Sequence, residues 1–208
     1  MSLAVEDAAQ LEDCVAGGGV AVFPTDTVYG VCCDPDSERA AARLYELKGR
    51  PATRASAVMF FTLESALSKL DDLHDCELLA LKALLPGAVT ALLANRGRRY
   101  GPACTVDPGT LGLRVPLLED GLEALRGVGR PVLQSSANLS GRPDARSLAE
   151  VPAELHEGVD LVLDGGELPG RPSTVLDLRE LHEHGRWSVL REGALAYEDV
   201  VALLGPSR

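Results

Sequence analysis

Short apolar runs alternate with amphipathic stretches along nearly the whole chain. The apolar runs predict buried strands, which are expected at 20–23, 57–61, 89–94, 111–115, 131–134, 159–164, 174–178 and 187–190. Apolar residues spaced by three or four positions predict helices. These are expected from Ser2 to Gly17, from Asp36 or Ser37 to Gly49, and at 63–70, 75–85, 118–126, 147–155 and 197–204.

Strands and helices interleave in this pattern. It therefore favours a single α/β domain over residues 1–208, built on an open or three-layer sheet. Strands that follow one another closely near the end of the chain predict some antiparallel pairs. In such sheets, ligands bind where the ends of strands meet loops. Catalytic and binding residues are therefore expected in the polar segments that follow strands.

The balance of charge limits the classes of function. The 208 residues include 20 Lys and Arg against 31 Asp and Glu, which gives a net charge of −11. Such an acidic chain is unlike proteins that coat nucleic acid through phosphate contacts, although a focused basic site is compatible with it. The arginine-rich segment 96–99 is open to two interpretations, an RNA-phosphate contact or a solvated loop.

No export signal or membrane span is predicted. The first residues form an amphipathic pattern, not a basic start followed by a long apolar run, and Lys82 interrupts the longest apolar segment. The five cysteines are scattered, and the adjacent Cys32 and Cys33 are interpreted as strand residues that face opposite sides. The four histidines form no metal-binding pattern, and 181–185 is interpreted as a polar turn. We expect a cytoplasmic protein with reduced thiols.

Cations and small polar residues gather after the expected strands and helices. Lys48 and Arg50 follow a helix, where they either complement its dipole or clamp a phosphate group. Arg114 ends an apolar strand, so it requires either a salt bridge or an anionic ligand. Ser136 and Asn138 follow another strand, where they form either a capped turn or a polar contact to a ligand.

Seven sequence stretches occur in a characteristic order between residues 20 and 195. They are PTDTVYG (24–30), KGRP (48–51), PGAVT (86–90), TLGLRVP (110–116), SSANLSG (135–141), DGG with PSTV (164–166 and 172–175) and LREGAL (190–195). In these stretches the chain resembles the YrdC/Sua5 family of threonylcarbamoyl-adenylate synthases. The chain ends soon after the last stretch, so the short form without the family's extra C-terminal domain is expected.

The resemblance implies a fold and a reaction. The fold is an open, twisted mixed sheet with flanking helices and a large, positively lined concave cavity. The reaction combines L-threonine, bicarbonate and ATP into threonylcarbamoyl-AMP and releases pyrophosphate. Mg²⁺ would arrive with ATP, and neither a tightly bound cofactor nor a dedicated metal site is expected. The product would pass to transferase proteins that modify adenosine 37 of tRNA, which makes tRNA a candidate partner.

The resemblance also implies roles for individual residues. The catalytic set is Lys48, Arg50, Ser136 and Asn138, which would hold the phosphates of ATP. Further ATP contacts are expected from Thr110, Arg146 and Arg191. The threonine pocket is expected to contain Thr27, Met59, Arg114 and Ser173 or Thr174, with Arg114 pairing with the threonine carboxylate.

Three short segments depart from the family pattern. Arg54-Ala55-Ser56 replaces a polar residue followed by Pro-Leu, and Met59 replaces a histidine at the threonine pocket. Asp144-Ala145-Arg146 stands where the family often has Ser-Pro-Thr, and Arg54 or Arg146 would supply compensating phosphate contacts. These departures leave alternatives open. They are a synthase acting on a different amine, a nucleotide-binding paralogue, and a module that binds RNA, including double-stranded RNA.

Overall fold

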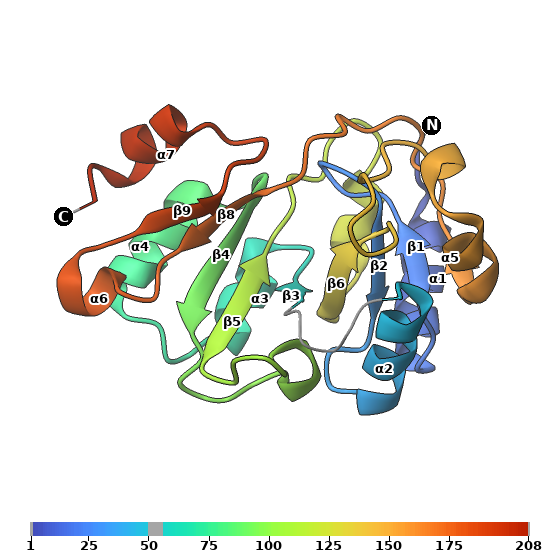
Figure 1. Cartoon of the computed structure of the whole chain (residues 1–208), viewed down its shortest axis with the longest axis horizontal. Helices are drawn as coiled ribbons and strands as arrows, with labels where there is room; N and C mark the ends of the chain where they lie inside the picture. The colour runs from blue at the N-terminus through green and yellow to red at the C-terminus, as the bar shows by residue number, and fades with distance from the viewer. Residues whose placement is uncertain (1, 50–55, 208) are drawn as a thin grey trace.

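The computed structural model describes residues 2–49 and 56–207, and a single mixed sheet runs through them. Its strands are β1 (Ala21–Phe23), β2 (Gly30–Cys33), β3 (Ala57–Met59), β4 (Val89–Ala94), β5 (Thr110–Arg114), β6 (Val132–Ser136), β7 (Leu161–Val162), β8 (Thr174–Asp177) and β9 (Ser188–Arg191). Within the described residues these nine strands follow the order β7-β1-β2-β6-β3-β5-β4-β8-β9 (Figure 1). The pairs β1–β7, β3–β5 and β4–β8 are parallel, and the remaining pairs are antiparallel.

Helices flank the sheet, and most of them lie at its two ends. They are α1 (Val5–Ala16), α2 (Glu38–Leu47), α3 (Leu63–Lys69), α4 (Asp75–Leu84), α5 (Ala153–Gly158), α6 (Leu181–His184) and α7 (Tyr197–Leu204). Figure 1 shows α1, α2 and α5 near β1, and α4, α6 and α7 near β9. Short 3-10 helices are η1 (Gly101–Ala103), η2 (Glu123–Gly127) and η3 (Leu148–Glu150). The predicted open α/β sheet with flanking helices is confirmed.

Local chemistry explains where several helices begin. Ser37 caps α2 as one of the two predicted caps, because its hydroxyl accepts a hydrogen bond from the Ala40 amide. The expected cap of α1 at Ser2 is wrong: that helix begins at Val5, and the carboxylate of Asp7 accepts the Ala4 amide. Among the described residues, none of the helices combines the length and the apolar character needed to cross a bilayer.

Four predicted elements differ from the structure. The helix expected at 147–155 is split into η3 and α5, because Pro152 lacks an amide donor and disfavours helical backbone at Val151. The helix expected at 118–126 is reduced to η2, because Asp120 and Gly121 form a turn with positive φ. The strand expected at 159–164 pairs only over β7, and the polar turn at 181–185 contains α6.

The sheet separates an apolar core from one polar face. Along β4, Val89, Ala91 and Leu93 are buried, whereas Thr90 and Leu92 between them line a cavity. Thr90 of β4 is the register partner of Arg114 in β5. The positions that face the cavity therefore continue from one strand to the next. Cys32 and Cys33 lie within β2 as predicted, and both are buried.

Candidate functional site

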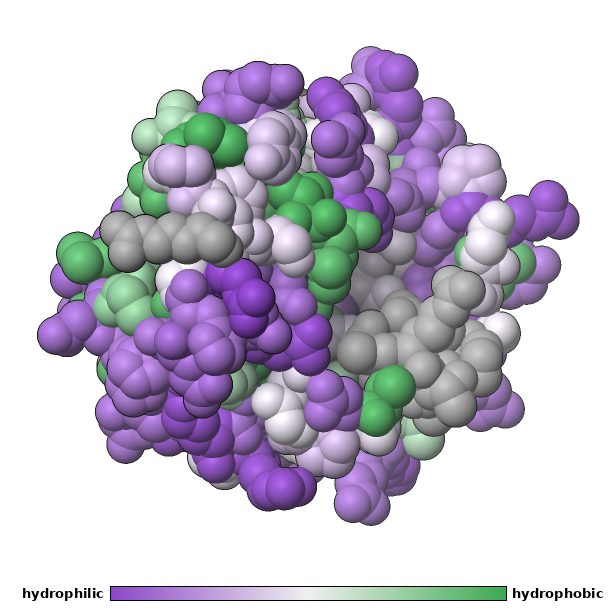
Figure 2. Space-filling model, turned by 60° about the vertical axis from the view of Figure 1, so that its left-hand side comes forward, coloured by the Kyte–Doolittle hydropathy of each residue, from purple (hydrophilic) through white to green (hydrophobic). Residues whose placement is uncertain are grey.

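A cavity of about 630 Å³ lies on the polar face of the sheet. Its floor comes from β4, β5, β6 and β8, whose alternate side chains point into it, and its walls come from the loops that follow α2, β6 and β7. Figure 2 shows a largely hydrophilic surface with a hollow near its centre. Cationic side chains that line the cavity, among the described residues, are Lys48, Arg114, Arg142, Arg179 and Arg191, against the carboxylates Asp107 and Asp144.

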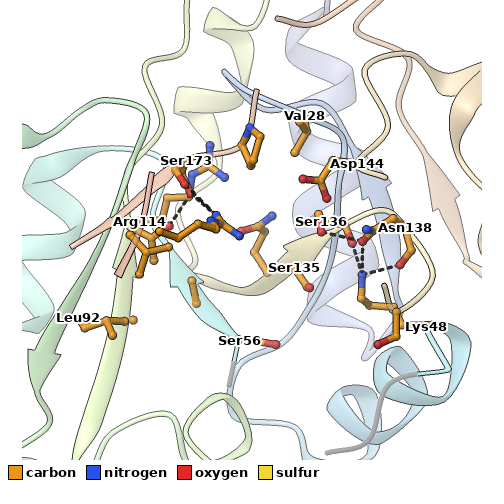
Figure 3. Close-up of a pocket in the computed structure, with 18 of the residues that line it drawn as sticks. Val28, Lys48, Ser56, Leu92, Arg114, Ser135, Ser136, Asn138, Asp144 and Ser173 are labelled. Atoms are coloured by element: carbon orange, nitrogen blue, oxygen red, sulfur yellow. Dashed lines mark hydrogen bonds between the residues drawn. The ribbon is translucent and has the colours of Figure 1, made fainter. Parts of the chain in front are cut away.

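Lys48 fixes the loop that follows β6. Its ammonium group donates hydrogen bonds to the carbonyl oxygens of Ser136 and Asn138 (2.7 Å for Asn138) and to Asn138 Oδ1 at 3.1 Å (Figure 3). The Ser136 hydroxyl also donates to Asn138 Oδ1, at 2.7 Å. Lys48 is only 2% exposed. The three residues therefore form one positively charged, preorganised unit at the end of β6.

Arg114 forms a buried ion pair beneath the cavity. Its guanidinium donates to the Asp26 carboxylate and to Thr27 Oγ1 at 2.6 Å. Burial lowers the pKa of Arg114; Asp26 opposes that shift, and the positive charge of Arg191 adds to it. Arg114 Nε is buried without a hydrogen-bond partner. The two guanidinium groups of Arg114 and Arg191 thus share one carboxylate, Asp26, which leaves net positive charge at this side of the cavity.

Ser173 lies between Arg191 and β4. Its carbonyl oxygen accepts a hydrogen bond from Arg191 Nη2 at 2.8 Å, and its hydroxyl lies 2.8 Å from Thr90 Oγ1. The neighbouring Thr174 has a different environment, because its buried hydroxyl donates to the Leu195 carbonyl oxygen and accepts the Gly193 and Leu195 amides. Ser173 therefore faces the cavity, whereas Thr174 holds the loop that follows β9.

A third polar cluster lies around Arg179, which sequence analysis did not identify. Arg179 donates to Thr110 Oγ1 at 3.0 Å and pairs with Asp107 and Asp177. The hydrogen bond from Arg179 lowers the pKa of Asp177. Asp107 and Arg179 lie 72 positions apart, so only the pairing of β4 with β5 and β8 brings them together.

The structure brings many of the predicted site residues together. Those that line the cavity are Lys48, Thr110, Arg114, Ser136, Asn138, Ser173 and Arg191. Thr27 lies directly beneath as a partner of Arg114. Arg50 falls outside the described residues. Their expected roles toward ATP and threonine stay predictions.

Besides Thr174, two predicted residues lie away from the cavity surface, Met59 and Arg146. Met59 is fully buried, although its register neighbour in β5 is Arg114. Arg146 does not line the cavity and pairs with Glu167 at the surface. Residues that sequence analysis missed include Gln134, which lines the cavity. Its position two residues before Ser136 in one strand would have placed it on the same face.

The arginine-rich segment 96–99 is largely neutralised. Arg96 pairs with Glu77, and Arg99 pairs with Asp71 and Asp72. Arginines held in this way have less charge to offer to RNA phosphates than solvated ones do. The structure therefore gives little support to an RNA-binding surface at this segment.

The adjacent Cys32 and Cys33 are not suited to act as nucleophiles, and the part of the chain that the structure describes contains no metal cluster. Burial raises the pKa of the Cys33 thiol to about 12 and raises that of Cys32 well above its usual value. Both thiols are thus protonated near neutral pH. Residues 2–49 and 56–207 contain no group of three or more His, Cys, Asp or Glu side chains that could hold a metal ion.

Comparisons with known proteins found a matching family model and several relatives. The Sua5/YciO/YrdC family model, described as "Telomere recombination", matches residues 13–193. A relative from Stutzerimonas stutzeri named threonylcarbamoyl-AMP synthase is 39% identical, over 82% of this chain and 91% of its own length. A Pyrococcus abyssi relative of the same name is 31% identical over 92% of this chain, which spans only 55% of that longer protein.

Solved structures show the same fold. Pyrococcus abyssi Sua5 complexed with L-threonine has a TM-score of 0.85 and 26% identity, covering 100% of this chain and 60% of that chain. Escherichia coli YciO has a TM-score of 0.78 and 27% identity, covering 96% of this chain and 100% of that chain.

Proposed function

Because the chain belongs to the Sua5/YciO/YrdC family, we propose that it is a threonylcarbamoyl-AMP synthase. The reaction joins L-threonine, bicarbonate and ATP into threonylcarbamoyl-AMP and releases pyrophosphate. The observation that carries the proposal is the cationic cavity of a protein whose overall charge is negative. It supplies positive charge at the place where two anionic reactants have to meet.

The chemistry requires positioning more than a protein nucleophile. The threonine amine and bicarbonate form threonylcarbamate with loss of water. A carbamate oxygen then attacks the α-phosphorus of ATP, and the bond to the β-phosphate breaks to release pyrophosphate. Both reactants are negatively charged, so fixed donors that hold them in line lower the barrier. Hydroxyl, amide and guanidinium groups at the ends of β5, β6 and β8 are suited to that task.

We assign the nucleotide phosphates to the side of the cavity that contains Lys48. The Lys48 ammonium group supplies a buried positive charge beside the loop around Ser136 and Asn138, and a fixed positive charge suits phosphate groups. Lys48 acts partly by positioning that loop, since its hydrogen bonds go to the backbone. Arg50, two residues further on, is proposed as a second phosphate contact.

We assign threonine to the opposite side, where Arg114, Ser173 and Arg191 meet. Asp26 compensates one of the two guanidinium charges, which leaves a net positive charge for a carboxylate. Among the described residues, Arg114 Nε has no hydrogen-bond partner, so this guanidinium has not used all of its donors. Arg191 also lines the cavity, and we propose that it contacts the nucleotide as well as the threonine side.

Mg²⁺ would enter with ATP. The described residues offer no metal cage of their own, and Mg²⁺ commonly binds through substrate phosphates, water and one or two carboxylates. Bound to the phosphates, the ion supplies charge neutralisation in the nucleotide. The residues of the chain would bind and orient the metal–nucleotide complex.

The product has a defined fate in the proposed role. Threonylcarbamoyl-AMP is a mixed anhydride and an activated acyl donor, so a separate transferase would use it to modify adenosine 37 of tRNA in the cytoplasm. Incubation with isotopically labelled bicarbonate, ATP, Mg²⁺ and threonine tests the synthase itself. We expect mass spectrometry to find the label in threonylcarbamoyl-AMP. Bound ATP without any labelled adenylate would contradict the proposal.

A further inference from the structure

One carboxylate that faces the cavity has no partner among the described residues. Asp144 lines it together with Lys48, Ser136 and Asn138. Figure 3 shows Asp144 on the same side as these residues and across from Arg114. In the part of the chain that the structure describes, the Asp144 side chain forms neither a hydrogen bond nor an ion pair. The other lining carboxylate, Asp107, is already held by Thr110 and Arg179.

The backbone holds Asp144 in place on both sides. The carbonyl oxygen of the buried Ala145 accepts the Tyr29 amide at 2.8 Å. The Arg142 amide donates to the Leu139 carbonyl at 3.0 Å, and the Arg142 carbonyl accepts from Asn138 Nδ2. The carboxylate is thus presented to the cavity from a fixed segment.

A free carboxylate at this place is unfavourable for bare ATP. Asp144 and the phosphates that we assign to Lys48 carry like charges, which repel across a partly enclosed cavity. A divalent cation between them reverses that interaction, because carboxylate and phosphate oxygens are the ligands that Mg²⁺ prefers. Since no cluster of three or more metal-binding side chains lies among residues 2–49 and 56–207, the nucleotide must complete the site.

We propose that Asp144 binds the Mg²⁺ ion that accompanies ATP. This inference rests on the proposed function, because it takes the cavity to be an ATP site. It predicts that Mg²⁺ and ATP each increase the affinity of the protein for the other. This mutual increase is expected to depend on the Asp144 carboxylate. It assigns Asp144 a binding role separate from that of Lys48, whose hydrogen bonds hold the loop.

The test compares four affinities for ATP, those of two proteins measured with and without Mg²⁺. Calorimetry measures ATP binding to the wild-type protein and to Asp144→Asn, each with Mg²⁺ and with a chelator, in the absence of threonine. In the wild type, Mg²⁺ is expected to tighten ATP binding about tenfold, the scale of a lost metal-binding partner. In Asp144→Asn this gain is expected to vanish, and metal-free ATP is expected to bind more tightly than it does to the wild type.

A matched variant controls for the loss of one charge. Asp107→Asn removes the other lining carboxylate, which is already paired, and is expected to retain the wild-type gain from Mg²⁺. An equal gain in Asp144→Asn and the wild type overturns the Mg²⁺ role while ATP binding itself survives. Failure of the wild type to bind ATP under both conditions overturns this inference and the proposed function together. Circular dichroism verifies that both variants are folded.

Discussion

The guanidinium of Arg114 and the carboxylate of Asp26 form an ion pair beneath the cavity, with only 4% and 7% of their side chains exposed. Asp26 also accepts the Leu117 amide at 3.0 Å, which ties two loops at the cavity rim together. The pair therefore combines a structural role with the presentation of Arg114 to the cavity.

Removal of Asp26 leaves a buried charge without compensation. We expect Asp26→Asn to lower the free energy of unfolding by about 3 kcal/mol, the scale measured when one partner of a buried pair is removed. Denaturant unfolding measures the change. Glu167→Gln is the matched control, because it breaks an exposed pair with Arg146 whose side chains are 67% and 51% exposed. That change is expected to cost less than about 1 kcal/mol. Equal costs in the two variants would contradict this account.

Loss of Lys48 is expected to impair use of ATP more than folding. Lys48→Ala removes the hydrogen bonds to the loop after β6 and a positive charge beside the phosphates. We expect kcat/KM for ATP to fall by about 100-fold, or ~3 kcal/mol, the scale of one or two charge-assisted hydrogen bonds. Lys82→Ala, on the exposed face of α4, is the control. If folded Lys48→Ala turned over at the wild-type rate, the assignment of Lys48 to the ATP site would be wrong.

Two adjacent hydroxyl groups are expected to respond differently to deletion. Ser173→Ala should raise KM for threonine by about tenfold, with a smaller loss of stability than Thr174→Val, because its hydroxyl lines the cavity and contacts only Thr90 and, at 3.4 Å, Arg191 among the described residues. Thr174→Val should lower the free energy of unfolding by about 2 kcal/mol, because it leaves the Gly193 and Leu195 amides without their acceptor. Steady-state kinetics and unfolding curves of both variants separate the two roles. A loss of stability in Ser173→Ala together with a raised KM in Thr174→Val would contradict these two assignments.

Alkaline pH tests the buried Tyr29. Burial and the hydrogen bond to Asp164 raise its pKa from 10.0 to about 12. Above pH 10 the unfolded chain ionises this phenol while the folded chain retains its proton. The stabilisation is therefore complete below pH 10 and is lost as pH rises toward 12. Between pH 10 and pH 12, the free energy of unfolding should fall less steeply with pH for Tyr29→Phe than for the wild type. Identical slopes would show that the phenol does not contribute.

Alternation and polar segments after strands are local signals, and they predict the positions of most strands and part of the cavity lining, whereas Thr110 and Ser173 are expected only from the family resemblance. Such local signals identify Lys48, Ser136 and Asn138, although they do not show the contacts among them. The Asp26–Arg114 pair spans 88 positions, and its formation depends on how the loops after β1 and β5 meet. No local sequence pattern predicts that these two side chains form an ion pair.

Long-range pairing also explains the residues that sequence analysis placed differently. The sequence carries no sign that Glu167 pairs with Arg146 at the surface, or that Asp107 and Arg179 join across three strands. The break before α5 differs, because Pro152 is a local signal that the predicted helix at 147–155 overlooked. Asp144 was noted as a departure from the family pattern, but only the structure shows that its carboxylate has no partner within the described residues.

The central claim is that the cationic cavity joins threonine, bicarbonate and ATP. The most direct test is the rate of pyrophosphate release by the purified protein with each of these three substrates omitted in turn. We expect release only when threonine, bicarbonate and ATP are all present with Mg²⁺. Release that is unaffected by omission of threonine or bicarbonate, or no release from protein that binds ATP, would contradict the account.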